Sequence, residues 1–286
     1  MTERLSFRRL TEADIEAAAG ILAAAYDNPS SRRPMSLRRY LALQPDGWLL
    51  ALLDGRPVGV GGAVNYGPFA SIGSVGVRPE AQRRGVARAL MERLLDWLEV
   101  ASCNVAVLVA TEAGVPLYRR LGFVEDGATL VFRRAASPWP DHAPSPRVSS
   151  LRAADLPEVA RFDAPIFGAA RPAVLAAYLA DDPARAFVAR DDSGAVAGYL
   201  IAQEQTLGPW AARTPENAEA LLSRALSLPF DEVARALAPS ANAEAVRLLQ
   251  RHGFEGPFML LRMRRGGTVT PGSPALLYGQ GSFAIG

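Results

Sequence analysis

The sequence predicts a mixed α/β fold (α+β) that is built twice, as two tandem domains of similar design. Three observations support this fold class. Three pairs of similar segments recur in the same order in the two halves of the 286-residue chain. Hairpin-like apolar runs alternate with helical patterns in each half. A proline-rich stretch separates the two halves.

The repeat is visible at three places in each half. The opening segments FRRLTEADIEAAAGI and VSSLRAADLPEVARF correspond, as do the closing segments PLYRRLGFVEDG and RLLQRHGFEGPF. Between them, WLLALLDGRPVGVGGAV and AFVARDDSGAVAGYLIA each place an Asp-Gly or Ser-Gly turn between apolar runs. Because the matches keep their order and spacing, we interpret the chain as a duplicated ancestral domain. The pairs are residues 7–21 with 148–162, 48–64 with 186–202, and 116–127 with 247–258.

The predicted organisation has four parts. The stretch SPWPDHAPSPR, from Ser137, has four prolines and is expected to be a semi-rigid linker. The last segment is rich in Gly, Ser and Pro but contains Leu276, Leu277, Tyr278 and Phe283. It is expected either to pack on a domain surface or to be a disordered tail. The first domain, linker, second domain and tail span residues 1–136, 137–148, 149–265 and 266–286.

The first half is expected to begin with a strand near residues 5–10 and to continue into helices. Thr11 has the residue type of an N-cap, and Asp14 follows it in the first turn. A second, short helix is expected at residues 37–43. Apolar residues recur at helical spacing on one face of the first helix, at Ile15, Ala18, Ala19, Leu22 and Tyr26.

Strands and two further helices complete the first half. Two hairpin strands are expected near residues 47–53 and 57–64, followed by strands at Ala70–Val77 and Ala128–Arg134. The run Val105–Val109 is short, β-branched and apolar, as expected of a central strand buried on both faces. Helices are expected after Gly85 and at residues 114–121. The first of these has an apolar face of Val86, Ala87, Leu90, Met91, Leu94, Leu95 and Leu98.

Composition excludes several classes of protein. A hydrophobic content of 49% with 21% charged residues describes a globular chain, and no apolar run approaches the ~20 residues of a membrane helix. The single cysteine, Cys103, fits a reducing compartment, and the first residues contain no signal-peptide core, so the expected location is the cytoplasm. His142, His252 and Cys103 form no metal-ligand pattern, and no metal is expected.

Charge argues against a nucleic-acid partner. All 31 basic residues are arginine, and 29 acidic residues nearly balance them, so no large positive face is predicted. The absence of lysine also excludes a Walker phosphate loop, which needs a lysine. No G-x-G-x-x-G follows a strand, so a dinucleotide fold is not indicated. Membranes are not expected partners either, and the sequence leaves the oligomeric state open.

A glycine at the start of the third helix suggests an anion site. Gln82-Arg-Arg-Gly85-Val-Ala joins a strand to an amphipathic helix. The first turn of a helix has N–H groups without intrahelical acceptors, and the helix dipole favours an anion there. Gly85 lets a phosphate approach the backbone closely, and Arg83 and Arg84 add positive charge. The alternative is an ordinary loop with a glycine at a helix start.

This corner carries a family resemblance. VRPEAQRRGVARAL, residues 77–90, resembles the acyl-CoA pyrophosphate loop of the GNAT superfamily of N-acetyltransferases, Gln/Arg-x-x-Gly-x-Gly/Ala, which Gln82, Gly85 and Ala87 match. TEAGVPLYRRLGF resembles the second signature of the family, a helix with Leu-Tyr that ends in Gly-Phe. The resemblance covers about residues 4–134, and the second half resembles the family in architecture only. It implies, for each domain, a mostly antiparallel sheet with a splayed strand and flanking helices.

The resemblance implies acetyl-CoA as cofactor. The strand Ala70–Val77 would splay from its neighbour and pair with the pantetheine arm through Val75 and Val77. The N–H group of Val75 would also polarise the thioester carbonyl. Thr111 stands where many members have a cofactor-binding asparagine. The backbone N–H groups expected to hold the pyrophosphate, after Gln82, belong to Arg83, Arg84, Gly85, Val86 and Ala87.

Tyr118 matches the proton-donating tyrosine of the family. With an ordinary pKa of about 10 it stays protonated at neutral pH and can donate to the departing coenzyme A thiolate. The alternative is a half-buried core aromatic. Cys103 has no base nearby in sequence, so direct transfer in a ternary complex is expected rather than an acyl-cysteine.

The acceptor is expected to be an amine on a small molecule, such as a simple amine, an amino acid or an antibiotic-like compound, with a protein N-terminus as the alternative. An alkylamine of pKa about 10.4 must lose a proton before it attacks. Many family members use a glutamate on the splayed strand, but ASIGSVGV has no carboxylate, so no base is named. Asn65, Tyr66 and Ser74 are the candidates for the acceptor side, with a solvated or packing role as the alternative for each.

The second half has lost most of these features. Pro215 and Glu216 stand near the position of the glycine corner, and a glutamate repels phosphate. Leu249 replaces the tyrosine, whereas Asn242 occupies the position that matches Thr111. Gln203, Glu204 and Gln205 could supply polar groups to an acceptor pocket. The second half is therefore expected to complete the pocket or to stabilise the first.

The resulting hypothesis is an acetyl-CoA-dependent N-acetyltransferase whose first domain is catalytic and which binds one cofactor per chain. Two alternatives remain. One is a non-catalytic acyl-CoA-binding regulatory protein. The other is a tandem acyltransferase with two active domains.

Overall fold

The two halves of the chain fold into the same series of elements. In the computed structural model, residues 4–27, 32–135, 145–230, 233–267 and 271–286 are described. The predicted linker lies mostly outside them, at residues 137–144. The elements of the first half are β1 (Leu5–Arg9), α1 (Ile15–Tyr26), α2 (Arg33–Leu43), β2 (Trp48–Leu53), β3 (Arg56–Asn65), β4 (Ala70–Val77), α3 (Val86–Val100), β5 (Ala106–Ala110), α4 (Val115–Arg120) and β6 (Val124–Ala135).

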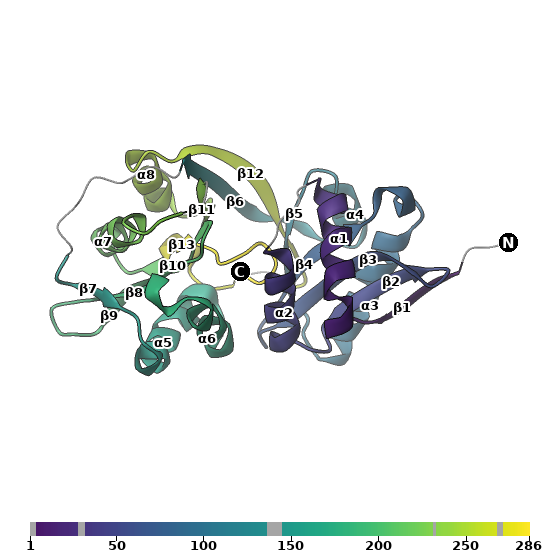
Figure 1. Cartoon of the computed structure of the whole chain (residues 1–286), viewed down its shortest axis with the longest axis horizontal. Helices are drawn as coiled ribbons and strands as arrows, with labels where there is room; N and C mark the ends of the chain where they lie inside the picture. The colour runs from purple at the N-terminus through teal and green to yellow at the C-terminus, as the bar shows by residue number, and fades with distance from the viewer. Residues whose placement is uncertain (1–3, 28–31, 136–144, 231–232, 268–270) are drawn as a thin grey trace.

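The second half repeats this order and adds one strand at its end. Figure 1 shows the halves as two lobes. The predicted mixed α+β class, with a mostly antiparallel sheet flanked by helices, is confirmed. The elements are β7 (Val148–Ser150), α5 (Leu156–Phe167), α6 (Pro172–Asp181), β8 (Ala186–Arg190), β9 (Val196–Ala202), β10 (Thr206–Ala212), α7 (Pro215–Leu226), β11 (Val233–Pro239), α8 (Ala243–Arg251), β12 (Glu255–Arg265) and β13 (Leu277–Gly279).

The entry into α1 differs slightly from the expected N-cap. A short 3-10 turn, Glu12–Asp14, precedes the helix. The Asp14 carboxylate accepts from the backbone N–H of Thr11 at 3.0 Å and from its hydroxyl at 2.7 Å. Arg8 donates to both oxygens of Asp14 at 2.6 and 2.7 Å, and this holds the pKa of the carboxyl well below its usual range. Contacts of Asp14 with Thr11 and with Arg8 thus hold the turn in place.

The sheet has a near-symmetric strand order. It runs β1-β2-β3-β4-β5-β12-β6-β11-β10-β9-β8-β7, so equivalent strands follow one another inwards from both edges. The last strand of each half is exchanged. β12 pairs with β5, where Leu261 lies opposite Ala110, and β6 pairs with β11, where Ala135 lies opposite Val233. β6 and β12 therefore pass between the lobes (Figure 1). The division at residue 136, predicted from the repeat, does not coincide with a division of the sheet.

The hydrophobic core also joins the halves. Side chains of α3 and α4 pack on one face of the first half, and those of α7 and α8 on the second. On the other face, α1, α2, α5 and α6 contribute to one common core. At the α2–α6 contact, Arg39 forms an ion pair with Asp181, and its guanidinium lies 4.2 Å from the ring centre of Tyr178. No helix within the described ranges is long and apolar enough to cross a membrane.

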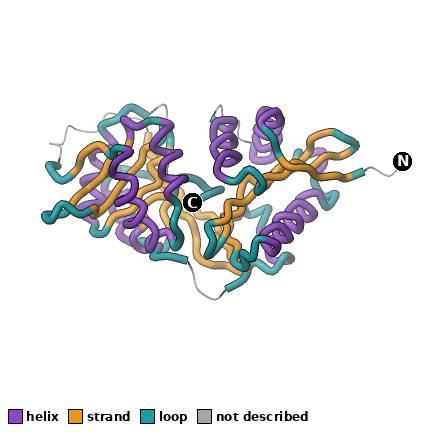
Figure 2. Tube along the Cα trace, turned by 90° about the horizontal axis from the view of Figure 1, so that it is seen from below, coloured by secondary structure: helices purple, strands orange, loops and turns teal. Residues whose placement is uncertain are grey.

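The end of the chain lies between the two lobes. Both Figure 1 and Figure 2 place the C-terminus there. Tyr278, Ala284 and Ile285 are buried. The final segment, residues 271–286, is therefore part of the fold and contacts both halves.

Candidate functional site

The sheet opens at the middle of β4. β4 and β5 pair in parallel at two positions, Ala70 with Ala106 and Ser71 with Val107, and no further pair is recorded between these strands. β4 is also bulged, because Gly62 pairs with Gly73 and Val60 with Gly76. A bulge interrupts the ladder and re-aims the chain, and bulges recur next to active sites. The result is a wedge between β4 and β5.

Ser74 and Val75 form the bulge. They lie opposite the single residue Gly61, and Ser74 has a φ of +52°, in the left-handed region. The Tyr26 hydroxyl, at the end of α1, donates to the carbonyl oxygen of Val75 at 3.0 Å. This bond fixes the orientation of the peptide at the wedge. Tyr26 thus has a polar function in addition to the apolar packing that the sequence pattern indicated.

A cavity of about 640 Å³ lies at the wedge. It brings together six of the residues predicted from sequence: Ser74, Val75, Thr111 and Tyr118 from the first half, and Gln203 and Gln205 from the second. Glu204, predicted with these two glutamines, is not among the lining residues. Its other walls come from α1, α2, the β9–β10 turn, β11 and the final segment. The lining residues from the second half include Gln203, Thr206, Arg235, Gly281, Ser282, Phe283 and Ala284.

Tyr118 is held on α4 between the cavity and the core. Its ring packs edge-on against Phe123, with ring centres 5.9 Å apart. A Cβ at Gly114 would lie 2.8 Å from the Tyr118 ring, so a residue without a side chain is required there. Burial raises the pKa of the Tyr118 hydroxyl above its ordinary value, because the phenolate is poorly solvated. The hydroxyl is therefore protonated at neutral pH.

The glycine corner has the backbone that an anion site requires. Gly85 has a φ of +80° at the N-cap of the 15-residue α3, and Arg83 has a φ of +59°. The loop is exposed, and space around the missing Gly85 Cβ is open. The first recorded α3 bond runs from the Ala89 N–H to the Gly85 carbonyl, at 2.9 Å. The N–H groups of Val86 and Ala87 precede it and have no intrahelical acceptor.

Gln82 has a structural contact in this loop. Its side-chain amide donates to the carbonyl oxygen of Val77 at 3.0 Å. This bond ties the loop to the end of β4, the strand that carries the bulge. The side chains of Arg83 and Arg84 are exposed beside it.

Asn65 and Tyr66 are not among the residues that line the cavity. The Asn65 side chain accepts from the Gly67 N–H at 2.8 Å, which closes a turn. Tyr66 packs edge-on against Phe167, 4.9 Å between ring centres, and donates to the carbonyl oxygen of Ile285 at 2.7 Å. Two of the three acceptor candidates thus have contacts elsewhere, and Ser74 alone lies at the cavity.

The second half has an equivalent wedge, which its own chain fills. β10 and β11 pair in parallel at Thr206 with Arg235 and Leu207 with Ala236. Beyond these pairs, β13 lies against β10, with Leu277 opposite Ala211. The Asn242 amide donates to the carbonyl oxygen of Leu277 at 3.0 Å. The polar residue that matches Thr111 thus binds the backbone of the final segment.

The other elements of a cofactor site are also absent from the second half. Thr214 caps α7 by accepting from the Asn217 N–H at 3.3 Å, and Pro215 removes one N–H from the first turn. Leu249 is fully buried in the core. At the start of α7, the Asn217 N–H is therefore bound by the Thr214 side chain and the N–H of the first position is missing.

Asn242 is expected to be a stability residue. Its side chain is buried, donates to Leu277 and accepts from the Ala245 N–H at 2.9 Å as the cap of α8. Asn242→Ala removes both bonds and leaves a buried carbonyl unpaired, so we expect a loss of about 2 kcal/mol in the free energy of unfolding. Denaturant unfolding measures it. Asn217→Ala, on the partly exposed face of α7, is the matched control with a change below about 0.5 kcal/mol. Equal stability of the two variants would contradict the cap.

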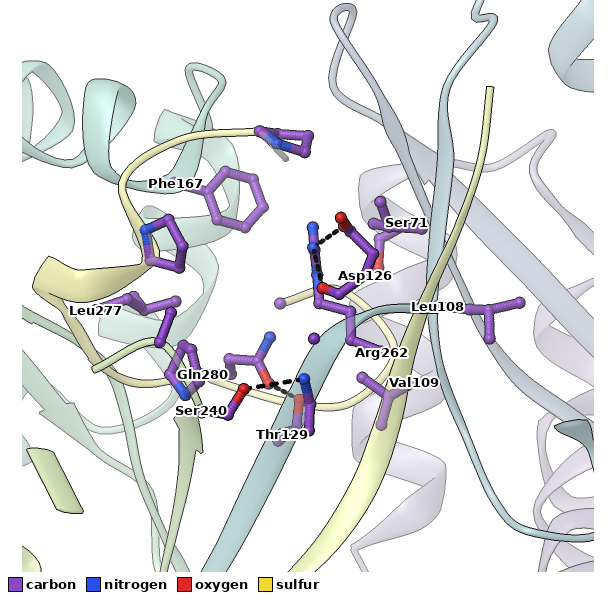
Figure 3. A pocket seen from close by; sticks show the side chains of 18 of the residues that line it. Ser71, Leu108, Val109, Asp126, Thr129, Phe167, Ser240, Arg262, Leu277 and Gln280 are labelled. Atoms are coloured by element: carbon purple, nitrogen blue, oxygen red, sulfur yellow. Dashed lines mark hydrogen bonds and ion pairs between the residues drawn. The ribbon is translucent and has the colours of Figure 1, made fainter. Parts of the chain in front are cut away.

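A second cavity, of about 320 Å³, lies between the two halves (Figure 3). From the second half it is lined by the end of β11 and by α5, the counterparts of β5 and α1 at the first cavity. From the first half it is lined by residues of β4 and β5, among them Ser71 and Leu108. Asp126 on β6 and Arg262 on the neighbouring β12 form an ion pair in its wall, and the Thr129 hydroxyl donates to Gln280 at 3.0 Å. These polar groups bind one another.

Sequence comparison identifies the family. The acetyltransferase (GNAT) family matches residues 15–123, and a second acetyltransferase (GNAT) domain matches residues 159–279. The chain belongs to the GNAT acetyltransferases. It is therefore an acyltransferase with two GNAT domains in tandem, as the sequence predicted.

Known GNAT proteins resemble the chain to different extents. It is 30% identical over 139 residues to the N-alpha-acetyltransferase RimI of Mycobacterium tuberculosis, which covers 47% of this chain and 88% of that protein. It is 41% identical over 59 residues to the ribosomal protein bS18-alanine N-acetyltransferase of Escherichia coli K12, 20% of this chain and 40% of that protein. The crystal structure of an acetyltransferase candidate from Pyrococcus horikoshii has a TM-score of 0.86 at 28% identity and covers 99% of this chain and 96% of that one.

GNAT enzymes use acetyl-CoA, and the first half fits it. The glycine corner offers main-chain N–H groups to a diphosphate, and the wedge beside β4 offers unpaired strand edge to an extended arm. Cys103 is buried outside the cavity, with its sulfur 3.6 Å from the Val105 carbonyl oxygen, and burial raises the pKa of its thiol. Within the described part of the chain, no group of three His, Cys, Asp or Glu could hold a metal.

Three features of this site were not predicted from sequence. They are the bulge at Ser74 and Val75, the contact of Tyr26 with Val75, and the contribution of Arg235 and the final segment to the cavity. Gly61, Gly62 and Gly73, which flank the bulge in GGAVNYG and ASIGSVGV, were its sequence signal, because glycine in a strand marks a bulge or a close approach.

Proposed function

We propose that this GNAT protein is an acetyl-CoA-dependent N-acetyltransferase and that its first half is catalytic. One observation carries the proposal. Tyr118 and the bulged main chain of Val75 meet at a wedge with a cavity beside it, whereas the equivalent wedge of the second half holds Leu277–Gly279. In the described part of the chain, the edge of β4 at the first wedge is therefore open to an extended cofactor arm, whereas β13 pairs with the equivalent edge of β10.

The cofactor supplies an activated acetyl thioester. The N–H groups from Arg83 to Ala87 would bind its diphosphate, and the main chains of Val75 and Val77 its pantetheine arm, with Thr111 beside the arm. The N–H of Val75 would stabilise the negative charge that develops on the thioester oxygen, since a donor fixed in advance costs no reorganisation. Tyr118 would donate its proton to the departing sulfur.

The acceptor amine must be deprotonated when it attacks. An alkylamine of pKa about 10.4 is neutral in roughly one molecule in a thousand at pH 7. The residues recorded around the cavity include no carboxylate, so Ser74 and solvent are the route we propose for the proton. Cys103 lies outside the cavity, which supports direct transfer from cofactor to amine.

The named relatives acetylate α-amino groups, and the E. coli relative modifies a ribosomal protein. In this chain the second half and the final segment form walls of the cavity. Walls from both halves limit the space beside the wedge, and this supports a small acceptor in our proposal. We therefore retain a small-molecule amine as the acceptor.

Titration with acetyl-CoA is expected to give one site per chain. The physical reason is that β13 occupies the wedge of the second half. Isothermal calorimetry measures the stoichiometry, and release of the coenzyme A thiol over a panel of amines measures turnover. Two equivalent sites would support a tandem enzyme with two active domains instead. One site without turnover of any amine, peptides included, would support the regulatory alternative.

A further inference from the structure

The charge of the cavity points to the chemistry of its acceptor. Two arginines line it from opposite halves, Arg33 on α2 and Arg235 on β11, and its recorded lining contains no Asp or Glu. Arg32 also lines it and forms an ion pair with Glu204. The charged side chains recorded in the lining are therefore all arginines, although the chain as a whole is nearly neutral.

Among the arginines that line the cavity, Arg235 has a hydrogen-bond donor without an acceptor. One terminal nitrogen donates to the Thr206 hydroxyl at 2.9 Å, whereas its Nε is buried and has no hydrogen-bond partner. Burial, together with Arg133 on the neighbouring strand, lowers the pKa of the Arg235 guanidinium. An arginine nevertheless keeps its charge in proteins, and a buried charge is costly unless it is paired. Arg235 is partly buried at the cavity wall, so its guanidinium, with an Nε that has no hydrogen-bond partner, has capacity to bind an anion there.

The polar neighbours of Arg235 do not supply that anion. The Gln203 amide donates to the carbonyl oxygens of Gly208 and Gly281, both at 2.8 Å. The Ser282 hydroxyl oxygen accepts from the N–H groups of Ala284 and Ile285, at 3.2 and 3.1 Å. Phe283 covers another side, with its ring centre 5.7 Å from the guanidinium carbon. These three neighbours of Arg235 are uncharged, and the polar groups of Gln203 and Ser282 are hydrogen-bonded to the backbone.

We propose that the acceptor is a small amine that carries an anionic group, a carboxylate or a phosphate, and that Arg235 binds this group. The inference rests on the proposed function and deepens it. Arginine presents a planar fork that matches both anions. With the anion on the second-half wall, the amine end of the molecule extends toward Val75 and Tyr118 on the first-half wall. Arg235 is thereby a specificity residue.

The test compares acceptors that differ in one group. Butylamine, 4-aminobutanoate and 2-aminoethyl phosphate are assayed with the full chain and acetyl-CoA, and their binding to the coenzyme A-loaded protein is measured by calorimetry. We expect the wild type to prefer at least one anionic amine over butylamine by about 10-fold or more. Arg235→Gln should raise KM for that acceptor by about 10- to 100-fold, which is the range for a lost charged hydrogen bond. Arg235→Lys should recover part of the loss.

Arg133→Gln is the matched control. Arg133 lies directly opposite Arg235 on β6, is exposed, and does not line the cavity. We expect it to leave the preference of the wild type intact. Acetyl-CoA affinity and melting temperature are measured for every variant, because a folding defect in Arg235→Gln would reduce both.

Four results would overturn the inference. The wild type could bind and use butylamine as well as both anionic amines, or Arg235→Gln could reduce all acceptors equally. Arg235→Gln could also weaken acetyl-CoA itself, which would assign the arginine to the cofactor. A clear preference for a peptide N-terminus over all small anionic amines would likewise contradict it. Failure of the proposed function has a different signature: no amine is acetylated, although the anionic amines still bind and Arg235→Gln still weakens their binding.

Discussion

Gly85→Glu is expected to raise the Kd for acetyl-CoA by at least about 100-fold, equivalent to roughly 3 kcal/mol. The φ of +80° at Gly85 favours glycine, and a side chain would project into the open space that the cofactor diphosphate requires. A glutamate adds a negative charge at the helix start, where the dipole and N–H groups should attract a phosphate. Calorimetric titration with acetyl-CoA measures the change.

The chain provides a matched control for this experiment. Gly55, in the β2–β3 turn, has a φ of +79° and equally open space around its missing Cβ. Gly55→Glu therefore imposes the same backbone strain and the same charge at a position away from the glycine corner, and it should keep the affinity of the wild type. Gly85→Ala, which adds strain and little bulk, should have an intermediate effect. Normal binding by a folded Gly85→Glu would place the diphosphate elsewhere.

Tyr118→Phe is expected to reduce kcat by about 100- to 1000-fold and to leave the Kd for acetyl-CoA nearly unchanged. The substitution keeps the ring that packs against Phe123 and removes the proton that we assign to the leaving sulfur. Stopped-flow or steady-state release of the coenzyme A thiol measures kcat. Tyr278→Phe is the control, since Tyr278 is a buried tyrosine that packs on Trp210 with ring centres 5.1 Å apart and does not line the cavity.

The pH dependence of kcat separates an acid from a base at this position. Because burial raises the pKa of Tyr118, the protonated form persists on the alkaline side of neutrality. If Tyr118 is the proton donor, kcat should therefore not decrease as the pH is raised from neutrality to about 10, the ordinary pKa of tyrosine. A kcat that rose toward that pH in the wild type and not in Tyr118→Phe would make Tyr118 a base. Full turnover in Tyr118→Phe would show that Tyr118 is not the proton donor, and Tyr26, which lies at the same wedge, would be the next candidate.

Local features of the fold could be predicted from the sequence because they depend on residues close together in the chain. The apolar faces of α1 and α3 and the run at β5 have the periods of their elements, so each element was found within a few residues of its expected bounds. The signature around Gly85 was also predictable, since a φ above zero and a helix start are properties of that short segment. The exchange of β6 and β12 was not predictable, because the residue pattern of a strand is the same whichever half of the sheet it pairs with.

The site shows the same distinction. Tyr118, Thr111 and Val75 follow from motifs, and the cavity brings them together. Asn65 and Tyr66 were chosen by their proximity to β4 in the sequence, but the turn and the aromatic contact with Phe167 take them away from the cavity. Arg235 lies 160 residues beyond Val75 and reaches the cavity through contacts that no local pattern encodes.

By itself the sequence determined the repeat, the fold class, the glycine corner and the loss of the tyrosine from the second half, because each is written in residue type and short-range spacing. Tertiary structure alone decided that the last strand of each half pairs with the other half of the one sheet, that residues 277–279 fill the second wedge, and that Arg235 lines the first cavity. The reason is physical. A strand edge or a cavity wall is completed by whichever segment packs there, and that choice depends on the free energy of the whole chain rather than on the segment alone.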